Sequence, residues 1–586
     1  MFEKVLVANR GEIAIRVMRT LEELGVASVA VYSEPDRDAP HVRRAGEAYL
    51  LGAGPANESY LVVEKILDVA RRSGAEAIHP GYGFLAENAP FARACEEAGV
   101  VFIGPPAEAI EEMGSKTRAR ELMRDAGVPI VPGTTDAVET IDDARRVIDE
   151  SVGYPVAIKA AGGGGGKGFR VAESEDELEK AFEGAAREGE KFFSDATVYV
   201  ERYLPDPRHV EVQVLADAHG NVIHLFERDC SVQRRHQKLI EESPAPAVDP
   251  ELREQIGKIG TDAARAVGYR SAGTIEGLLQ DGDYYFLEMN TRVQVEHCVT
   301  EMVTGIDIVR EQVKIAAGEP LAYAQEDVDI RGHAIECRIN AEDASKKFAP
   351  APGRIGSYRE PSGPFVRVDS GAEEGYEVLP LYDPMIAKLI VWDVDRSAST
   401  RRMLRALGEY EIEGLQTLVP FHRALLASEQ WAAGETCRDL VEDQDWLAQL
   451  AVPSAAGDGE PEAEKLERDY EVEVSGRRFD VKVIGDALTP NGAAPAGGGM
   501  RKAPRRERKS DGGGGTPGAL ISPIQGTVLR VAVEKGAQVD EGALVCVIEA
   551  MKMENEITAP TAGTVEELSV SEGGSVATGD TIAVIH

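Results

Sequence analysis

The chain has 586 residues, of which 43% are hydrophobic, so it is long enough and apolar enough to form several domains with their own cores. Its formal net charge of -37 and its isoelectric point of about 4.8 argue against a nucleic-acid-binding protein. The six cysteines show no close spacing, which excludes a disulfide framework and a zinc site of the common patterns and indicates a reducing cytoplasm.

The composition also bears on the environment of the protein. Of the 64 basic residues, 19 are lysine and 45 are arginine. An acid-rich, lysine-poor chain resembles proteins of salt-loving organisms, where salt screens the self-repulsion, and an acidic protein from ordinary salinity is the alternative. The first residues, MFEKVLVANR, have the pattern of a strand and not of a signal peptide, and no apolar run has the length of a membrane span. We therefore expect neither a membrane nor a nucleic acid among the partners.

The first 115 residues alternate between strand and helix patterns. The runs KVLVA, GEIAIRVMRTLEELG and VASVAVYS follow one another with short connections. A strand, a helix and a second strand in this order form a βαβ unit, which requires a parallel sheet. We expect a doubly wound α/β domain here.

The segment 154–174, YPVAIKAAGGGGGKGFRVAES, contains five consecutive glycines. It is not a Walker phosphate loop, because Gly168 follows Lys167 where a Ser or Thr would hold magnesium, and because a strand follows instead of a helix. Two strands around a glycine-rich turn form a hinged hairpin whose bare N–H groups can close over phosphates. Lys159, on the first strand, would add a positive charge near those phosphates. A surface loop without function is the alternative.

The segment 273–297 predicts a hairpin with two opposed carboxylates. A three-residue turn at 281–283 would pair Gln280 with Tyr284, and the same register then places Glu276 opposite Glu288. Like charges directly opposite each other destabilise a sheet. Their neighbours are largely apolar, so a solvent-exposed face is the less favoured interpretation.

A divalent cation would resolve this repulsion, since magnesium takes carboxylate and phosphate oxygens together. Strand alternation places Asn290 and Arg292 on the same face as Glu288. Glu296 follows as a candidate general base.

The last third of the chain contains two linkers and a repeat. Residues 331–447 mix strands and helices, whereas 452–464 and 486–517 are rich in Gly, Pro, Ala and charge and are typical of linkers. Between them, 469–485 has the alternation of two strands and a turn. The basic run 501–509 could contact an acidic partner or a nucleic acid, and a solvated linker is the favoured interpretation.

Residues 523–549 recur as 560–586 with a constant offset of 37. An internal repeat of this kind indicates two copies of one supersecondary unit, and the alternation of each copy predicts short strands. Lys552 lies between the two copies, between the strands VCVIEA and ENEITA, so we expect it at the tip of a hairpin. A solvated turn lysine is the alternative, but the methionines on both sides favour a recognition patch for a modifying enzyme.

The run AMKM in a small repeated β domain resembles the biotinyl carrier domain, with Lys552 as the biotinylated residue. A lipoyl carrier usually flanks its lysine with Asp and Ala. The glycine-rich hairpin and the paired carboxylates resemble an ATP-grasp ligase. The runs HPGYGFLAEN, MGSKTRAR, ERDCSVQRRHQK, EMNTRVQVEH and GHAIECRINAED are similar to biotin carboxylase throughout residues 1–446.

This resemblance implies an α/β multidomain chain, the α subunit of an acetyl- or propionyl-CoA carboxylase. The implied domains are a doubly wound α/β domain at 1–115, an ATP-grasp domain at 116–330, an α+β biotin carboxylase C-terminal domain at 331–447, a linker with a short β segment at 448–517, and an all-β biotinyl domain at 518–586.

The resemblance also implies site residues. Those that hold ATP are Lys116, Lys159, Gly165, Gly166, Glu201, Leu204, His209, Gln233 and His236. Those that bind two Mg²⁺ or Mn²⁺ ions are Glu276, Glu288 and Asn290. Those that hold bicarbonate are Lys238, Arg292, Gln294 and Val295. Glu296 deprotonates bicarbonate, and Arg338 faces the ureido oxygen of biotin. The chain departs from the family's pattern at two of these places: Cys298 stands for the usual Pro in the loop after the base, and Arg202 stands for a frequent Lys at the adenine rim.

The implied reaction is the ATP-dependent carboxylation of carrier-bound biotin with bicarbonate. The implied partners are a separate carboxyltransferase subunit, a biotin protein ligase and further copies of this chain. The carboxyltransferase must be separate, because residues 447–517 are too short to form one. Another ATP-grasp ligase fused to a lipoyl-type carrier is the first alternative, and a scaffold or nucleic-acid-binding protein acting through its linker is the second.

Overall fold

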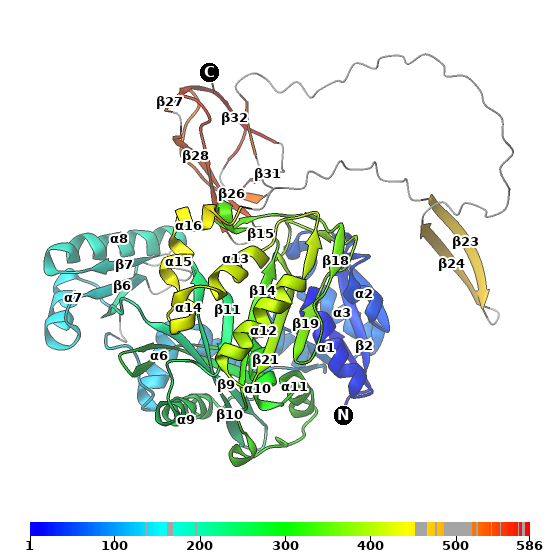
Figure 1. The fold of residues 1–586 in the computed structure, drawn as a ribbon. Helices are drawn as coiled ribbons and strands as arrows, with labels where there is room; N and C mark the ends of the chain where they lie inside the picture. Colours follow the sequence, from blue (N-terminus) through cyan, green and yellow to red (C-terminus); the bar gives the residue numbers. More distant parts are fainter. Residues whose placement is uncertain are drawn as a thin grey trace. The chain divides into compact units, whose positions relative to one another are not determined.

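The computed structural model describes residues 1–134, 137–160, 168–193, 196–451, 466–474, 477–485, 519–522, 526–540, 542–550, 553–571, 574–576 and 580–585. The chain divides into two compact units, Met1–Pro453 and Ser454–His586, which we describe separately (Figure 1). Across the described residues, every helix is too short or too polar to span a lipid bilayer.

The first unit begins with a parallel five-stranded sheet of order β3-β2-β1-β4-β5. Its strands are β1 (Lys4–Val7), β2 (Ala27–Ser33), β3 (Glu47–Gly52), β4 (Ala77–His79) and β5 (Val101–Phe102). Helix α1 (Gly11–Glu23) packs on one face, and α3 (Val63–Ser73) and α4 (Ala89–Glu97) pack on the other. Apolar strands covered on both faces are typical of doubly wound domains. The expected βαβ unit and the doubly wound domain are confirmed.

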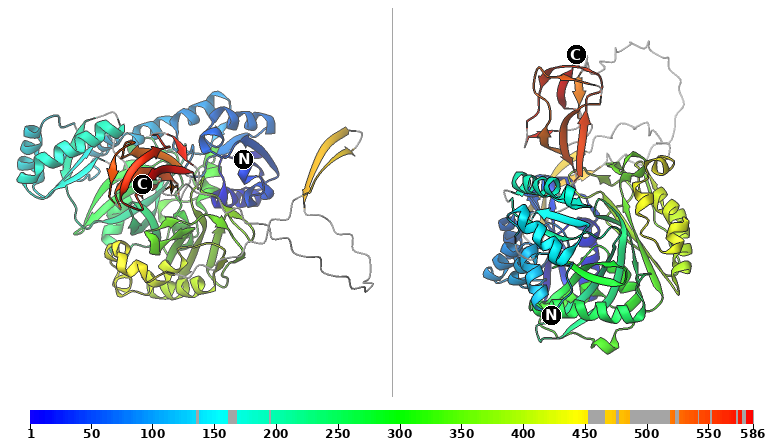
Figure 2. Two further views of the ribbon diagram at one scale, coloured as in Figure 1. Left: turned by 90° about the horizontal axis from the view of Figure 1, so that it is seen from above. Right: turned by 90° about the vertical axis from the view of Figure 1, so that its left-hand side faces the viewer.

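A small three-stranded sheet follows, of order β7-β6-β8. Its strands are β6 (Val156–Ala160), β7 (Phe169–Ala172) and β8 (Val198–Arg202), covered by α7 (Ile141–Val147) and α8 (Glu175–Phe193). This lobe projects to one side of the unit in both Figure 1 and Figure 2. Strands β6 and β7 are antiparallel, as the segment 154–174 predicts, and the residues 161–167 between them lie outside the described part.

One eight-stranded antiparallel sheet forms the centre of the unit, in the order β13-β12-β9-β10-β11-β14-β21-β19. Its strands are β9 (Arg208–Ala216), β10 (Val222–Arg234), β11 (Gln237–Ser243), β12 (Ser271–Gln280), β13 (Asp283–Asn290), β14 (His333–Asn340), β19 (Val366–Ser370) and β21 (Met385–Asp393). The sheet runs without a break across residue 330, because β11 pairs with β14. It therefore joins the expected ATP-grasp region to the expected C-terminal region.

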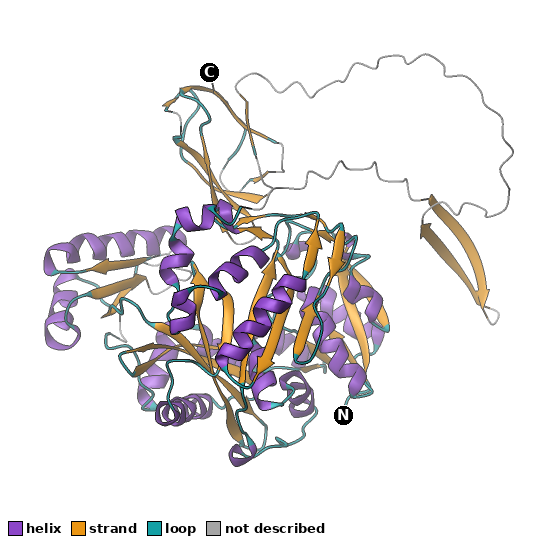
Figure 3. Cartoon of the chain, viewed as in Figure 1, coloured by secondary structure: helices purple, strands orange, loops and turns teal. Residues whose placement is uncertain are grey.

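Helices cover this sheet on both faces (Figure 3). α12 (Arg396–Glu409), α13 (Val419–Leu426), α14 (Glu429–Ala433), α15 (Arg438–Glu442) and α16 (Gln444–Ala448) pack over β14 and β21 through one large apolar cluster. The opposite face of these strands meets α10 (His297–Thr304). Helix α9 (Pro250–Ala266) packs against β9 and β10, and α11 (Ile308–Ala316) joins the cluster around α1.

The second unit contains a hairpin and a β domain. β23 (Leu466–Val474) and β24 (Arg477–Gly485) form the predicted antiparallel pair. The β domain consists of two four-stranded sheets, of order β25-β32-β30-β27 and β29-β28-β26-β31. Its strands are β25 (Ala519–Ile521), β26 (Gly526–Val531), β27 (Gln538–Val539), β28 (Leu544–Ala550), β29 (Met553–Thr558), β30 (Gly563–Leu568), β31 (Ser575–Val576) and β32 (Thr581–Ile585).

The repeat of 37 residues appears in this domain strand by strand. β26 and β30, β27 and β31, and β28 and β32 all begin 37 residues apart. Each sheet takes strands from both copies, so the two copies interleave around one apolar core. β28 and β29 pair with Ala550 opposite Met553, as expected of a hairpin. Lys552 lies outside the described residues.

Candidate active site

A cavity of about 740 Å³ lies between the three-stranded sheet and the eight-stranded sheet. The residues singled out from the sequence that line it are Lys159, Glu201, Leu204, His209, Gln233, His236, Lys238, Glu276, Glu288, Asn290, Arg292, Gln294, Val295, Glu296 and Arg338. Gly165, Gly166 and Lys552 lie outside the described residues. So does the side chain of Lys116, which is the first residue of α6 (Lys116–Asp125).

The hairpin that carries the paired carboxylates has a shorter turn than the sequence predicted. Asp281 and Gly282 alone connect β12 to β13, with φ angles of 55° and 87°. Two central residues with positive φ make the tight turn that suits the twist of two antiparallel strands. Gln280 therefore pairs with Asp283, and the predicted pairing of Gln280 with Tyr284 is wrong.

A bulge restores the carboxylate pair nevertheless. Leu287 is the extra residue on β13, so Glu288 returns to the position opposite Glu276, and this predicted pairing is confirmed. On the other side of β12, Glu276 also lies opposite Glu211 of β9. Three carboxylates thus form a row across three adjacent strands, and Glu211 and Glu276 are buried.

Lys238 stabilises this row of carboxylates. Its Nζ lies 2.6 Å from Glu211, 2.8 Å from Glu276 and 2.6 Å from Glu296. Burial alone would lower the pKa of Lys238, but the neighbouring carboxylates, Glu211 first, raise it well above its usual value. The lysine therefore stays charged in the cavity wall.

Glu296, the candidate base, lies between two cations. Lys238 contacts its Oε1, and Nη2 of Arg338 donates to its Oε2 at 2.9 Å. Burial would raise the pKa of Glu296, but Lys238, Arg338 and Arg228 together outweigh burial and lower it to about 2. The carboxylate is therefore ionised and able to accept a proton.

Arg338 also contacts a fully buried carboxylate on the neighbouring strand. Its Nε donates to Oε1 of Glu241 at 2.6 Å. Burial raises the pKa of Glu241 to about 7, and Arg338 opposes that rise. β11 and β14 are adjacent in the sheet, which brings these two residues together from positions 97 apart in the chain.

The far side of the cavity carries the residues expected around a nucleotide. Lys159 of β6 donates to Glu201 of β8, and Arg120 donates to the other oxygen of Glu201 at 3.0 Å. His236 lies in the tight turn between β10 and β11, with a φ of 68°. Nε2 of His209 lies 3.0 Å from Glu276, and although burial would lower the pKa of His209, Glu276 and Glu211 together raise it to about 9.

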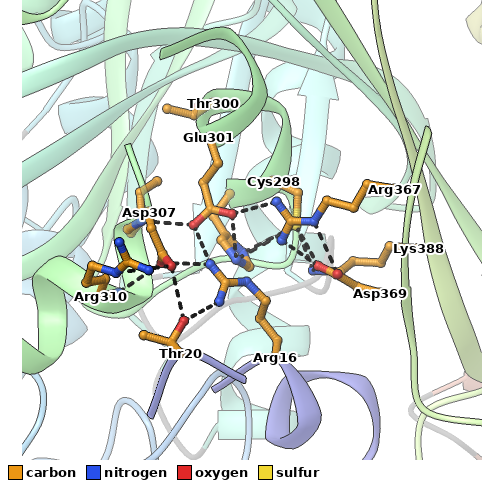
Figure 4. Close-up of polar contacts among 12 residues, drawn as sticks. Arg16, Thr20, Cys298, Thr300, Glu301, Asp307, Arg310, Arg367, Asp369 and Lys388 are labelled. Carbon is orange, nitrogen blue, oxygen red and sulfur yellow. Dashed lines mark hydrogen bonds and ion pairs between the residues drawn. The ribbon is translucent and has the colours of Figure 1, made fainter. Parts of the chain in front are cut away.

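The helix that follows the base is held by a network of buried ion pairs. Glu296 is the N-cap residue of α10, and Glu301 lies on that helix. Arg16 of α1 and Arg367 of β19 both reach Glu301, at 2.9 Å and 2.7 Å (Figure 4). Asp307 binds Arg16 as well, at 2.7 Å. Three regions of the first unit therefore fix the position of α10.

Lys388 holds the loop just before the base. Its Nζ is fully buried, donates to the carbonyl of Val295 at 2.8 Å and lies 3.1 Å from Sγ of Cys298 (Figure 4). Cys298 in turn lies 3.3 Å from Asp369. Cys298, which stands where the family usually has Pro, therefore has a defined place in the first turn of α10, so a helix and not a loop follows the base.

Several site residues were missed by the sequence analysis. They are Glu211, Arg228, Glu241, Arg120 and Glu87, which contacts Nε of Arg292 at 2.9 Å. Only Glu211 carried a local signal: His209, Glu211 and Gln213 alternate with three valines along the strand. The other four depend on long-range contacts.

The donor set fits a divalent metal. Glu276 and Glu288 are opposed carboxylates, and Asn290 lies two residues further along the same strand. Hard oxygen ligands of this kind suit Mg²⁺ or Mn²⁺.

Four family models match the chain. They are the biotin carboxylase N-terminal domain at residues 1–110, the carbamoyl-phosphate synthase L chain ATP-binding domain at 115–324, the biotin carboxylase C-terminal domain at 336–443, and the biotin-requiring enzyme model at 518–585. Together with the cavity, these matches define an ATP-grasp ligase joined to a biotinyl carrier domain.

Comparison with individual known proteins narrows this class of ligase further. The chain is 46% identical to the biotin-dependent acyl-coenzyme A carboxylase alpha3 subunit of Mycobacterium leprae, over 99% of this chain and 98% of that protein. It is 55% identical to one of the subunits of pyruvate carboxylase from Methanothermobacter thermautotrophicus, over 76% of this chain and 90% of that protein. The biotin carboxylase domain dimer of Hydrogenobacter thermophilus 2-oxoglutarate carboxylase, solved with MgADP, ADP and bicarbonate, has a TM-score of 0.70 and 51% identity, covering 74% of this chain and 96% of that chain.

The chain therefore belongs to the biotin carboxylase family: it is an ATP-dependent biotin carboxylase fused to a biotin carrier domain. It is a ligase that uses ATP, and its carrier domain takes a covalently bound biotin.

Proposed function

We propose that this chain is the α subunit of an acyl-CoA carboxylase of the acetyl- or propionyl-CoA type. The supporting observation is the extent of the match to the Mycobacterium leprae acyl-CoA carboxylase protein, which covers 99% of this chain and so includes the carrier domain. The relatives named for pyruvate and 2-oxoglutarate match 76% of it. In this proposal residues 1–447 form the enzymatic part in three domains divided near 115 and 330, 448–517 form the linker, and 518–586 form the carrier.

The cavity carries out the first half-reaction in this proposal. Lys238, Arg292, Gln294 and the backbone of Val295 hold bicarbonate, and Glu296 takes its proton, which is general-base catalysis. The deprotonated bicarbonate attacks the γ-phosphate of ATP to give carboxyphosphate and ADP. The position of Glu296 between Lys238 and Arg338 supports this role, since the two cations keep the base ionised and attract the anion.

The nucleotide residues and the metal ligands have matching roles. Lys116, Lys159, Gly165, Gly166, Glu201, Leu204, His209, Gln233 and His236 hold ATP in this proposal. Glu276, Glu288 and Asn290 would hold Mg²⁺ or Mn²⁺, which neutralises charge on the phosphate oxygens when it is bound. Two of these side chains also keep Lys238 and Arg292 in place, because Glu276 accepts from Lys238 and Asn290 accepts from Arg292.

Arg338 places a permanent positive charge where the ureido oxygen of biotin lies in this proposal. Biotin, bound to Lys552, supplies the nitrogen that accepts the carboxyl group. An arginine suits this position because it does not lose its proton, and Glu241 fixes its orientation through a 2.6 Å hydrogen bond.

The proposed partners follow from the same reaction. A biotin protein ligase modifies Lys552, and a separate carboxyltransferase subunit passes the carboxyl group to the acyl-CoA. We also propose a homo-oligomer, which the dimer described for the Hydrogenobacter thermophilus domain supports, and a cytoplasmic location, which the free, buried cysteines support.

Two assays test this proposal. The purified chain should release ADP from ATP in a reaction that requires bicarbonate and is accelerated by free biotin. After co-purification with its carboxyltransferase, it should incorporate labelled bicarbonate into acetyl- or propionyl-CoA. Labelling of pyruvate or 2-oxoglutarate instead of an acyl-CoA would remove the acyl-CoA assignment, and ADP release that ignores bicarbonate would remove the half-reaction. Avidin binding of the intact chain separates a biotinyl carrier from a lipoyl carrier.

A further inference from the structure

A fully buried arginine, Arg228 of β10, lies opposite Glu211 of β9 in the central sheet. All five N–H groups of its guanidinium are used. Nε donates to Glu211 at 2.7 Å, one terminal nitrogen donates to Gln213 at 2.8 Å and Thr300 at 3.0 Å, and the other donates to Thr274 at 3.2 Å and Gln294 at 2.8 Å. Arg228 is not among the residues that line the cavity, so it touches the site only through other side chains.

The contact with Gln294 determines which end of the amide faces the cavity. Arginine can only donate hydrogen bonds, and an ionised carboxylate can only accept them. The amide oxygen of Gln294 must therefore face Arg228, and its NH₂ group faces the other way, where it donates to Glu276 at 2.6 Å. This chemistry settles the amide orientation independently of how its atoms are assigned.

The same arginine also supports the lysine of the site. Glu211 accepts from Arg228 through one oxygen and from Lys238 through the other. Glu211 is fully buried, and its charge is compensated by these two cations. The guanidinium of Arg228 thus orients Gln294 directly and Lys238 through Glu211.

We propose that Arg228 is a positioning residue for bicarbonate binding: it holds the amide of Gln294 with its N–H groups toward the anion and holds Glu211 under Lys238. Without the guanidinium fork, the amide oxygen loses its donor and only the contact with Glu276 still holds the amide, so orientations that present the oxygen to the anion, which repels it, become more populated. This inference rests on the proposed function, because it takes the ligand of Gln294 to be bicarbonate.

The test is Arg228→Lys, which keeps the positive charge but replaces the five-donor fork by a point charge with three donors. We expect the KM for bicarbonate to rise at least about tenfold, the value of one lost hydrogen bond to a charged group. The KM for ATP should stay within about twofold. Bicarbonate and ATP are varied in turn, each with the other saturating, while ADP release is measured in the presence of free biotin.

Arg253→Lys is the matched control. Arg253 forms a similar ion pair with the buried Glu227, at 2.9 Å, but does not line the cavity. It should leave the KM for bicarbonate within about twofold of wild type. An Arg228→Lys variant with an unchanged KM for bicarbonate, or an equal rise in both variants, would overturn the inference.

A double-mutant cycle tests the path of the effect. Gln294→Ala should raise the KM for bicarbonate by itself, and adding Arg228→Lys should raise it further by clearly less than the factor that Arg228→Lys gives alone, since only the contact through Glu211 then remains. If the KM increases of the two single variants multiply fully in the double variant, Arg228 does not act through Gln294. If Arg228→Lys does not fold, Thr300→Val, which removes one of the five acceptors, should raise the same KM by about threefold. An unchanged value would overturn the inference.

The two levels of failure are distinguishable. A wild-type chain whose ADP release ignores bicarbonate refutes the proposed function. A wild-type chain that responds to bicarbonate, with an Arg228→Lys variant that responds equally well, refutes only the role of Arg228.

Discussion

Replacing Arg338 by Gln separates its catalytic role from its structural role. The guanidinium contacts two buried carboxylates, Glu241 at 2.6 Å and Glu296 at 2.9 Å. Removing one partner of a buried ion pair costs about 3–5 kcal/mol of folding free energy, because a buried charge remains uncompensated. Losing a fixed cation that faces a developing negative charge slows the reaction by about 10²–10³. Arg338→Gln should therefore lower both stability and the rate of biotin carboxylation, with the KM for ATP nearly unchanged.

A second variant distinguishes the two losses. Burial raises the pKa of Glu241 to about 7 even with Arg338 beside it, so the charge of this carboxylate is the one that becomes most costly when the arginine is removed. Adding Glu241→Gln to Arg338→Gln removes the uncompensated charge for good. Most of the lost stability should return, and the free energy of unfolding should come within about 1–2 kcal/mol of wild type. The rate should stay low, since the cation is still missing.

The assay is ADP release with free biotin, alongside urea unfolding of each variant. A double variant that recovers the wild-type rate would show that Arg338 acts only by keeping the fold intact. A single variant within about fivefold of the wild-type rate would remove Arg338 from the mechanism altogether. Arg402→Gln is a matched control, because Arg402 forms a half-buried ion pair with Asp393 at 2.8 Å and does not line the cavity.

Four further predictions concern the carrier, the linker, pH and salt. Lys552→Arg should abolish avidin binding and acyl-CoA carboxylation while ADP release with free biotin continues; an avidin-reactive variant would remove this lysine. Deleting 488–514 should leave biotinylation and ADP release with free biotin intact but cut coupled acyl-CoA carboxylation severely. The reason is that a coil of 32 residues at 486–517 spans roughly 30 Å root-mean-square and lets the carrier domain move between sites. A coupled rate within about twofold of wild type would refute the role of this segment as a tether. Burial lowers the pKa of four fully buried histidines to about 4 or about 3. The unfolded chain therefore binds their protons below pH 6.5 while the folded chain does not, and the free energy of unfolding should fall by up to about 1.4 kcal/mol per pH unit for each as pH drops from 6.5 toward 4. These histidines are His41, His79, His297 and His422. Melting temperatures at pH 7.5 and 5.5 check this, His41→Gln should flatten the slope, and equal temperatures for wild type would contradict it. If the charge of -37 is a salt adaptation, the melting temperature should rise steeply with KCl, and a flat curve from about 0.1 to 2 M would favour ordinary salinity.

Much of the local structure could be predicted because it depends on short-range pattern. The repeat offset of 37 residues reappears in the starting positions of three pairs of strands. The pairing of Glu276 with Glu288 was predicted correctly from an incorrect turn, because the bulge at Leu287 offsets the shorter turn. Hydrophobic periodicity reveals neither the length of a turn nor the position of a bulge. The predicted pairing was therefore correct only because the error in the turn length and the missed bulge cancelled.

The site residues also divide into those that a local motif reveals and those that depend on long-range contacts. Glu296 and Arg338 could be named from motifs, since each lies in a recognisable run of sequence. Glu241, which orients Arg338, and Arg228, which orients Gln294, lie in strands whose sequences do not identify their partners. Their roles exist only because β11 pairs with β14 and because β10 lies in the same sheet as β12, with α10 packed against it.

The sequence by itself determined the periodic strands and helices, the repeated carrier domain and the motifs that assign the family. Only the tertiary structure decided which buried charges compensate one another. The physical reason is that hydrophobic periodicity is a property of neighbouring residues, whereas the energy of a buried charge depends on whichever partner the folded chain brings within about 3 Å of it. Lys238 illustrates this: its three carboxylates come from β9, from β12 and from the N-cap of α10.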